Sequence, residues 1–340
     1  MKSSLLILGG TQQIGRRLIE VLQASDKDQY DIHLFNRGKT NPHLFPFAKR
    51  IIGDRNTDAI EQIFARDWDI VLDCTCYQPH SLQKILKGLK GRVGRYILIS
   101  TISVYDYEQN KENPSPIAED FPLRSFTQDQ INAEGFRFYG EKKVAAEQFL
   151  QESEQSDHII LRPHFIYGRY DWQNLDYYWM YRLRHFDRLL LPEGGQDLVH
   201  RSYIEDLVKA LLVLMELPKH RQVYNFTSHP AIPLHTYLDT LEAVMGTTTQ
   251  RIPAPTAFLQ EQKIRPVYDI PLWSNGSHFQ FSNAKLEADV AMAYTRLDQS
   301  MEETYAWNQE RSEWKEGRLG MSREKEEALL KQLAIHSSVD

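Results

Sequence analysis

A tyrosine and a lysine four residues apart form the pair in this chain that is best suited to proton transfer. Tyr139 and Lys143 open a segment with helical character, residues 139–151, so their side chains are expected on one helix face. A lysine ammonium and a nicotinamide cation both favour a phenolate, and so lower a tyrosine pKa that is ordinarily about 10. This chemistry predicts that Tyr139 exchanges a proton with a substrate hydroxyl or carbonyl near neutral pH. The spacing alone is weakly diagnostic, because the two residue types meet by chance on many helices.

Hydroxyl side chains lie where a predicted strand ends. Ser100, Thr101 and Ser103 follow the apolar segment 96–99. In an open parallel sheet, active groups gather at the carboxyl ends of the strands. We therefore expect this segment to lie close to Tyr139.

A glycine-containing turn joins the first predicted strand, residues 5–8, to the first predicted helix, residues 14–22. Free backbone N–H groups and the dipole at a helix N-terminus favour the pyrophosphate of a dinucleotide. Gly9 would supply the tight turn and Gly15 the close contact between helix and strand. Gln12 replaces the middle glycine of the G-x-x-G-x-x-G pattern, and its side chain is expected to hinder the approach of the phosphates. The turn predicts dinucleotide binding, or a glycine turn without a ligand, and the candidate contacts are Gly9, Thr11, Gln12, Ile14 and Gly15.

The end of the second predicted strand, residues 32–35, carries no carboxylate. An acidic residue there accepts hydrogen bonds from the ribose of NAD, whereas an arginine accommodates the 2′-phosphate of NADP. Asn36 and Arg37 occupy this place, and Arg16 lies just past the glycine turn. The sequence therefore favours NADP over NAD, with a solvated surface charge as the alternative for Arg37. Asp54, after the third predicted strand, is a candidate for the adenine amino group or an ordinary turn carboxylate.

Short apolar strands alternate with helical segments through the first half of the chain, as in a parallel sheet covered by helices on both faces. The predicted fold class is α/β: a Rossmann-type doubly wound parallel sheet with a smaller C-terminal substrate-binding subdomain. We assign residues 1–163 to the dinucleotide-binding domain, with segments around 196–230 returning to it, and residues 164–340 mainly to the substrate-binding subdomain and a C-terminal helix. Residues 106–132 are polar and contain prolines, so a long loop is predicted. Further helices are predicted at 139–151, 204–216, 234–245 and 322–334.

Aromatic residues crowd into the segment that follows Pro163. Histidine, phenylalanine, tyrosine and tryptophan recur between residues 164 and 181, interleaved with arginines. Aromatic faces beside guanidinium groups suit a ring-bearing or anionic substrate, so this segment is expected to roof the site. A plain core or interface is an equally weighted alternative. His164 and Arg201 are expected near the substrate, with a structural histidine and a surface turn as the alternatives.

Four motifs follow one another in a recognisable order. They are Gly9-Gly10-Thr11-x-x-Ile14-Gly15, Ile99-Ser100-Thr101-x-Ser103-Val104-Tyr105, Tyr139-Gly140-x-x-Lys143-x-x-x-Glu147 and Arg162-Pro163-x-x-x-Tyr167-Gly168. This order resembles that of the extended short-chain dehydrogenase/reductases, also called the NAD-dependent epimerase/dehydratase family. The similarity spans roughly residues 4–245, and the four motifs together are far more specific than any one of them.

The resemblance implies a role for each matched residue. Tyr139 would be the catalytic acid/base, Lys143 would hold the nicotinamide ribose, and Thr101, with Ser103 as its backup, would hydrogen-bond the reacting oxygen. Pro163 would pack near the nicotinamide. The second half would bind a small-molecule substrate, in one branch a sugar nucleotide, and we assign its substrate-binding residues as His164, Tyr167, Tyr178 and Arg201. The resemblance also makes a homodimer plausible.

Several residues depart from the family pattern. Arg169 follows Gly168 where a proline is common, and a Cys-Thr-Cys segment at residues 74–76 replaces a run of small residues beside the cofactor. The interval from Thr101 to Tyr139 is long, which predicts an enlarged loop near the site. These departures resemble an atypical branch that includes the chloroplast stem-loop RNA-binding proteins. A non-catalytic nucleotide- or RNA-binding protein on the same fold is therefore the alternative to an NAD(P)-dependent oxidoreductase, epimerase or dehydratase.

Composition narrows the class of protein further. The chain has 340 residues, which suits about two domains. Its formal net charge of −6 argues against a protein that mainly neutralises phosphate backbones, so nucleic acid is not the expected partner. Two cysteines, one residue apart, fit a reducing compartment and form no metal site of recognised spacing. The first apolar run is too short for a signal peptide and no run approaches about 20 apolar residues, so a cytoplasmic protein without membrane spans is expected.

Overall fold

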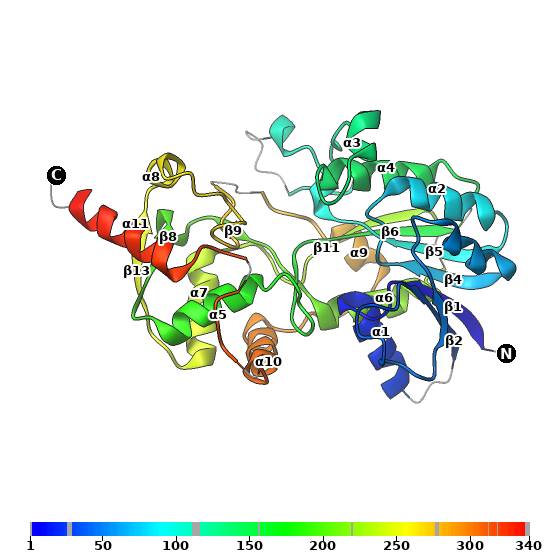
Figure 1. Cartoon of the computed structure of the whole chain (residues 1–340), viewed down its shortest axis with the longest axis horizontal. Helices are drawn as coiled ribbons and strands as arrows, with labels where there is room; N and C mark the ends of the chain where they lie inside the picture. The colour runs from blue at the N-terminus through cyan, green and yellow to red at the C-terminus, as the bar shows by residue number, and fades with distance from the viewer. Residues whose placement is uncertain are drawn as a thin grey trace.

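A lobe built on an open sheet and a C-terminal lobe lie side by side in the computed structural model of the chain (Figure 1). The structure describes residues 2–25, 29–110, 116–155, 157–218, 220–275, 279–311, 313–317 and 319–336. Part of the predicted long loop, residues 111–115, lies outside these ranges. We call the two parts the sheet lobe and the C-terminal lobe.

Seven parallel strands form the central sheet. In spatial order they are β11 (Gln222–Phe226), β6 (His158–Pro163), β5 (Val93–Ile99), β4 (Trp68–Asp73), β1 (Ser3–Leu8), β2 (Tyr30–Asn36) and β3 (Lys49–Ile52). Each pairing between neighbours is parallel. The predicted doubly wound parallel sheet is therefore confirmed. Its strand order reverses between β1 and β4, and ligands of such sheets bind at the carboxyl ends of the strands beside this reversal.

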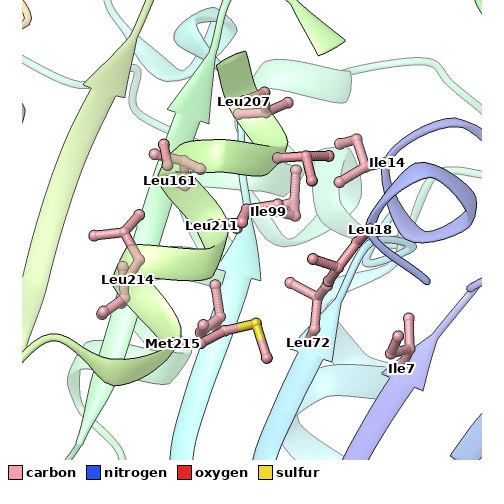
Figure 2. Packing of buried hydrophobic residues seen from close by; sticks show 14 of the residues in the cluster. Ile7, Ile14, Leu18, Leu72, Ile99, Leu161, Leu207, Leu211, Leu214 and Met215 are labelled. Atoms are coloured by element: carbon pink, nitrogen blue, oxygen red, sulfur yellow. The ribbon is translucent and has the colours of Figure 1, made fainter. Parts of the chain in front are cut away.

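Alternating side chains bury both faces of the sheet. Leu5 and Ile7 of β1 belong to the core on one face, and Leu6 and Leu8 belong to the core on the other. Figure 2 shows the first of these cores, in which leucines of the helix Ile204–Glu216 pack over side chains of β1, β4, β5 and β6. The covering helices are α1 (Gln13–Ala24) and α6 (Ile204–Glu216) on the first face, and the 3-10 helix η1 (Asp58–Ala65), α2 (Pro79–Gly88) and α4 (Tyr139–Gln151) on the second.

The C-terminal lobe has a hydrophobic core of its own, in which helices surround the parallel pair formed by β8 and β13. The shorter pair β9 with β12 accompanies it, whereas the pair β7 with β10 packs in the core of the sheet lobe. Figure 1 shows α9 apart from this lobe, against β11 of the sheet. The bounds are β7 (Ile166–Tyr167), α5 (Leu175–His185), β8 (Arg188–Pro192), η4 (Glu193–Gly195), β9 (Leu198–Val199), β10 (Ser202–Tyr203), β12 (Ile232–Pro233), α7 (Leu234–Met245), β13 (Gln250–Ala254), α8 (Thr256–Glu261), α9 (Ala284–Asp289), α10 (Leu297–Gln309) and α11 (Arg323–His336).

Five α-helices of the described residues arise where the sequence pattern predicts none. Three of them are α8, α9 and α10, and the other two show why the pattern misses a helix. α5 lies in the aromatic segment and is buried on nearly every side, so it shows no apolar stripe of helical period. The predicted long loop contains the short helix α3 (Gln128–Asn132) and the 3-10 turn η3 (Tyr107–Asn110). A further 3-10 turn, η2 (Ile102–Val104), lies just before this loop. A capping box in which Thr127 and Gln130 bond each other's backbone starts α3. Short-range capping therefore organises part of a segment whose composition alone indicates a loop.

Candidate active site

The structure brings Tyr139, Lys143 and Thr101 together at the carboxyl end of β5. Tyr139 is the first residue of α4, and its phenol forms a hydrogen bond with the Thr101 hydroxyl. Lys143 lies one turn later, where its Nζ donates to the Ile99 carbonyl oxygen at 2.7 Å and lies 6.0 Å from the centroid of the Tyr139 ring. Ser103 lies beside Thr101, since the Ser103 backbone N–H donates to the Thr101 Oγ1 at 3.2 Å. A phenol, an ammonium and two hydroxyls thus share one site.

Burial dominates the acidity of the Tyr139 phenol. It raises the pKa of Tyr139 to about 12, while the hydrogen bond with Thr101 acts in the opposite direction. The predicted lowering by Lys143 is not seen among the chain's own groups, because the ammonium is held on the Ile99 carbonyl oxygen. The protein by itself therefore keeps Tyr139 as a neutral phenol that can donate a proton.

A close contact and a strained residue set where α4 begins. Phe138, at the helix N-cap, has φ 56 and ψ 41, a left-handed conformation that is costly for a bulky side chain. A Cβ on Gly140 would lie 2.4 Å from the Ser103 carbonyl oxygen, so only glycine lets α4 approach this turn. The buried Lys142 ammonium donates to the carbonyl oxygens of Ala133 and Gly135, which ties the enlarged loop to the helix. These contacts position Tyr139 against Thr101.

A buried ion pair supports the site from behind. Arg162 donates to both carboxylate oxygens of Glu147, with Nη2 to Oε2 at 2.6 Å, and Ser100 Oγ donates to the same carboxylate. Arg162 Nη1 also donates to Tyr105 Oη at 2.9 Å. Arg162 and Glu147 are both buried, at 2% and 0% exposure. This network joins the ends of β5 and β6 to α4, and so joins the residue before Thr101 to the helix of Tyr139.

The glycine turn has the geometry of a close approach between strand and helix. Gly9 has φ +108, and a Cβ there would lie 2.4 Å from Thr75 Cγ2. A Cβ on Gly15 would lie 2.7 Å from the Gly10 Cα, so the first turn of α1 packs directly on the turn backbone. Gln12 is exposed at the N-cap of α1 and its side chain caps no backbone N–H. Of the other predicted contacts, Thr11 and Ile14 are buried.

Two buried side-chain donors beside this turn have no partner in the described part of the chain. They are Gln13 Nε2, at the start of α1, and Asn36 Nδ2, at the end of β2. The first turn of α1 also carries no acidic side chain. Unused donors at a helix N-terminus and at the neighbouring strand end suit phosphate and ribose oxygens, because those groups are acceptors. The site therefore fits a dinucleotide.

The residues predicted to read the adenosine end lie on exposed turns. Arg37 is exposed just after β2 and forms no ion pair with the described residues, while Asn36 Oδ1 accepts from the Gly38 N–H at 2.9 Å. Asp54 Oδ1 accepts from the Asn56 backbone N–H at 3.0 Å. Asp54 thus organises its own turn, as in the alternative interpretation of this carboxylate, and Arg37 keeps its guanidinium available.

Three of the four predicted substrate-binding residues are buried among other residues of the chain. Tyr167 is fully buried with its hydroxyl bonded to His229 and Ser300. Tyr178 lies in the C-terminal core, with Arg182 Cζ 3.8 Å from its ring centroid, and Arg201 donates to both oxygens of buried Asp176. Their contacts are satisfied internally, so we place none of the three in the site, and much of the aromatic segment is core.

His164 keeps one nitrogen available. The Phe165 backbone N–H donates to His164 Nδ1 at 2.8 Å, and burial lowers the pKa of His164 well below its usual value. The ring is therefore neutral, with its proton on Nε2. Pro163 is buried at the end of β6, opposite Phe226 of β11.

Of the aromatic side chains near Tyr139, the sequence predicts only some. The Phe136 ring centroid lies 6.5 Å from that of Tyr139, 5.3 Å from that of Tyr77 and 6.5 Å from that of Trp172, with the Phe136 and Trp172 rings stacked. Phe136 belongs to the enlarged loop, and Trp172 to the segment after β7. Their exposed rings, at 62% and 49%, form a contact between the two lobes beside the site. Only Trp172 stood in the predicted aromatic segment.

The described residues contain neither a metal-ligand cluster nor a membrane-spanning helix. No group of three or more histidine, cysteine, aspartate or glutamate side chains is arranged as metal ligands there. Within the same residues, no helix combines the length and apolar character needed to span a bilayer.

The sheet order and the glycine turn at the β1–β4 reversal define a Rossmann-type fold. Residues 5–226 match the profile of the NAD dependent epimerase/dehydratase family. The chain belongs to this family.

Proteins that this chain resembles carry names that describe different functions. The chain is 24% identical over 247 residues to the chloroplast stem-loop binding protein of 41 kDa b from Arabidopsis thaliana, a match that covers 66% of this chain and 59% of that protein. It therefore spans less than two thirds of that relative. A UDP-glucuronic acid 4-epimerase from Bacillus cereus, solved with NAD, superposes with a TM-score of 0.68 at 16% identity, over 90% of this chain and 98% of that one. RMD from Pseudomonas aeruginosa, complexed with NADPH, superposes with a TM-score of 0.65 at 17% identity, over 91% and 100%.

Proposed function

We propose that the protein is an NAD(P)-dependent oxidoreductase, epimerase or dehydratase that acts on a small substrate with a hydroxyl or carbonyl group. The observation that carries this proposal is the convergence of Tyr139, Thr101 and Lys143 at the end of β5, one strand from the β1–β4 reversal. Family membership supports it, because the matched region contains all three residues.

Each group has a distinct part in the proposed reaction. A bound nicotinamide would supply or accept the hydride. Tyr139 moves the proton to or from the substrate oxygen, and Thr101, with Ser103 behind it, orients that oxygen. Lys143 holds the cofactor ribose. A positive charge on the bound nicotinamide, close to Tyr139, would oppose the effect of burial on the pKa of Tyr139. His164 offers its Nε2–H to a substrate acceptor.

Asn36 and Arg37 favour NADP. The end of β2 presents an amide donor and a guanidinium that pairs with no carboxylate of the described residues, in place of a carboxylate. Arginine binds a phosphate through paired N–H groups, whereas an NAD ribose needs an acceptor at this position. The solved structures of this fold named above contain NAD in one case and NADPH in the other, so both dinucleotides are compatible with the fold.

Calorimetric titration tests the cofactor assignment. We expect saturable NADPH binding that Arg37→Gln weakens by about tenfold or more, because a charge-assisted hydrogen bond is lost. NADH serves as the internal control, since its affinity should not change in the same variant. Absence of saturable binding of either dinucleotide would refute the proposed function.

Activity measurements test the role of Tyr139. Sugar nucleotides, including UDP-glucuronic acid, and simple ketones and aldehydes are screened with NADPH and NADP by nicotinamide absorbance and by product analysis. Tyr139→Phe should lower turnover about 100- to 10,000-fold while cofactor affinity stays near that of the wild type. Tyr77→Phe is the matched control, because it removes a neighbouring phenol 6.4 Å away between ring centroids without touching Thr101. Equal losses in the two variants would contradict the assignment.

RNA binding is the second candidate, favoured by the name of the Arabidopsis relative. The net charge of −6 argues against it. Filter binding with a stem-loop RNA at several salt concentrations distinguishes the two candidates. Binding with a steep salt dependence, together with no dinucleotide binding, would favour the RNA-binding function.

A further inference from the structure

A cavity lies where the segment after β7 meets α5 and α10 in the C-terminal lobe. Its walls include Asp171, Asn174, Trp307, Asn308 and Arg311, none of which belongs to the proposed proton-transfer site. The cavity has room for about one water-sized group and is partly open to solvent, so it suits a single oxygen of a ligand rather than a whole ligand.

Arg311 differs from the fully buried arginines of the protein. Its Nε donates to Asn308 Oδ1 at 2.7 Å, its Nη2 donates to Asn174 Oδ1 at 2.5 Å, and its Cζ lies 4.1 Å from the Tyr177 ring centroid. No carboxylate of the described residues lies within ion-pair distance of it. Each buried arginine of the described residues pairs with a carboxylate, namely Arg55 with Asp73, Arg95 with Asp157, Arg162 with Glu147, Arg182 with Glu326 and Arg201 with Asp176.

The neighbours of Arg311 fix the orientation of its guanidinium, and no carboxylate among the described residues forms an ion pair with it. Two amide oxygens and a tyrosine face fix the plane of the guanidinium, and the described residues leave its Nη1 without a hydrogen-bond partner. Partial burial lowers the pKa of Arg311, since the nearby Asp171 and Tyr177 compensate only in part. A rigid, unpaired guanidinium is suited to bind an oxoanion, because its N–H groups already point in fixed directions.

Asp171, on the same cavity, adds a second polar group. Its Oδ1 accepts from the Gln173 backbone N–H at 2.8 Å. Burial and the negative charge of Asp176 raise the pKa of Asp171 to about 7, while Arg201 acts in the opposite direction. Near neutral pH, this carboxyl is therefore partly protonated and can donate a hydrogen bond toward an oxygen held by Arg311.

We propose that this cavity binds a small oxoanion, a carboxylate or a phosphate, through Arg311, with Asp171 as a hydrogen-bond donor. The proposal goes beyond the proposed function, because it needs no dinucleotide. The segment that forms one wall also carries Trp172, which stacks on Phe136 near Tyr139. A bound anion would thus contact the same segment that reaches the candidate active site.

Calorimetric titration of the full chain with inorganic phosphate, and separately with acetate, tests the proposal without any dinucleotide. We expect one saturable site per chain for at least one of the two anions, and the tighter anion identifies the headgroup. Arg311→Gln should weaken that binding by about tenfold or more. Arg296→Gln is the matched control, because Arg296 is exposed at the N-cap of α10 and pairs with Asp298, so wild-type affinity is expected.

Two further variants keep the test decisive if Arg311→Gln fails to fold. Asn174→Asp places a carboxylate on the Arg311 Nη2, so it should neutralise the guanidinium and abolish anion binding. Asp171→Asn should retain binding above pH 7, where the wild type weakens because the Asp171 carboxylate becomes charged beside Asp176 and Arg311. The proposal is overturned if the wild type shows no saturable binding of either anion, or if Asn174→Asp binds as the wild type does.

Discussion

The ion pair between Glu147 and Arg162 provides the sharpest test of how this fold supports its site. Glu147→Gln removes the negative charge that faces a guanidinium with 2% exposure, while the amide keeps the size of the side chain. Breaking a buried pair by removing one charge costs about 3–5 kcal/mol, because the remaining charge stays buried without a partner. Unfolding entropy of about 2.1 cal/mol/K per residue gives about 0.7 kcal/mol/K for 340 residues. The expected decrease in Tm is therefore about 4–7 °C.

Thermal unfolding followed by circular dichroism measures this loss, and two further variants isolate its cause. The double variant Glu147→Leu with Arg162→Met replaces both charges by apolar groups, so it should recover a large part of the stability lost in the single variant. Glu154→Gln is the control, because Glu154 pairs with Lys90 on the surface at 72% and 62% exposure, and its loss should cost less than about 1 kcal/mol.

The same variants report on the site. Ser100 donates to Glu147 and immediately precedes Thr101, so Glu147→Gln should weaken NADPH binding or turnover beyond its effect on Tm. A Tm for Glu147→Gln within about 1 °C of the wild type would refute the reasoning. So would a double variant that is less stable than Glu147→Gln, since the two charges would then act independently.

Three other predictions follow, one from a close backbone contact and two from shifted pKa values. Gly140→Ala should lower Tm and reduce turnover, because the new Cβ would lie 2.4 Å from the Ser103 carbonyl oxygen. Gly317→Ala is the control, because its Cβ would have no contact closer than 3.8 Å. Equal Tm values in the two variants would contradict this prediction. Asp171 has a folded pKa of about 7 against 3.8 for its ordinary value, so wild-type stability should fall as pH rises from about 4 to 7, and Asp171→Asn should flatten this part of the Tm–pH profile. Burial lowers the pKa of His200 to about 4, so stability should fall as pH drops from about 6.5 to 4, and an unchanged slope in His200→Gln would count against that cause.

Local patterns predicted the elements of the sheet lobe well. The apolar runs at residues 5–8 and 96–99 are in β1 and β5, and the segment 139–151 is α4. Such predictions succeed because a strand buried on both faces needs a continuous apolar run, which is visible in the sequence. The meeting of Tyr139 with Thr101 could also be anticipated, since both follow from where elements of a parallel sheet begin and end.

The C-terminal lobe was harder to predict from the same signals. α5 is enclosed by other elements, so its sequence carries no period that separates an inner face from an outer one. The sequence around the arginines of this region does not indicate which of them pair with a carboxylate. Arg201 forms an ion pair with Asp176, whereas Arg311 has no carboxylate of the described residues within ion-pair distance, and only packing distinguishes the two.

Residue order and spacing along single elements were enough to predict the fold class and the family, and they also single out Tyr139 and Lys143 as the proposed proton-transfer pair. The tertiary structure decided which polar groups are left unpaired, since pairing depends on residues far apart in the chain. Glu147 and Arg162 neutralise each other from different elements, and Gln13 Nε2 and Asn36 Nδ2 keep donors free at the glycine turn. In a low-dielectric interior, an unpaired polar group is costly unless a ligand satisfies it. For that reason the proposed binding sites rest on the packing of the chain as well as on its motifs.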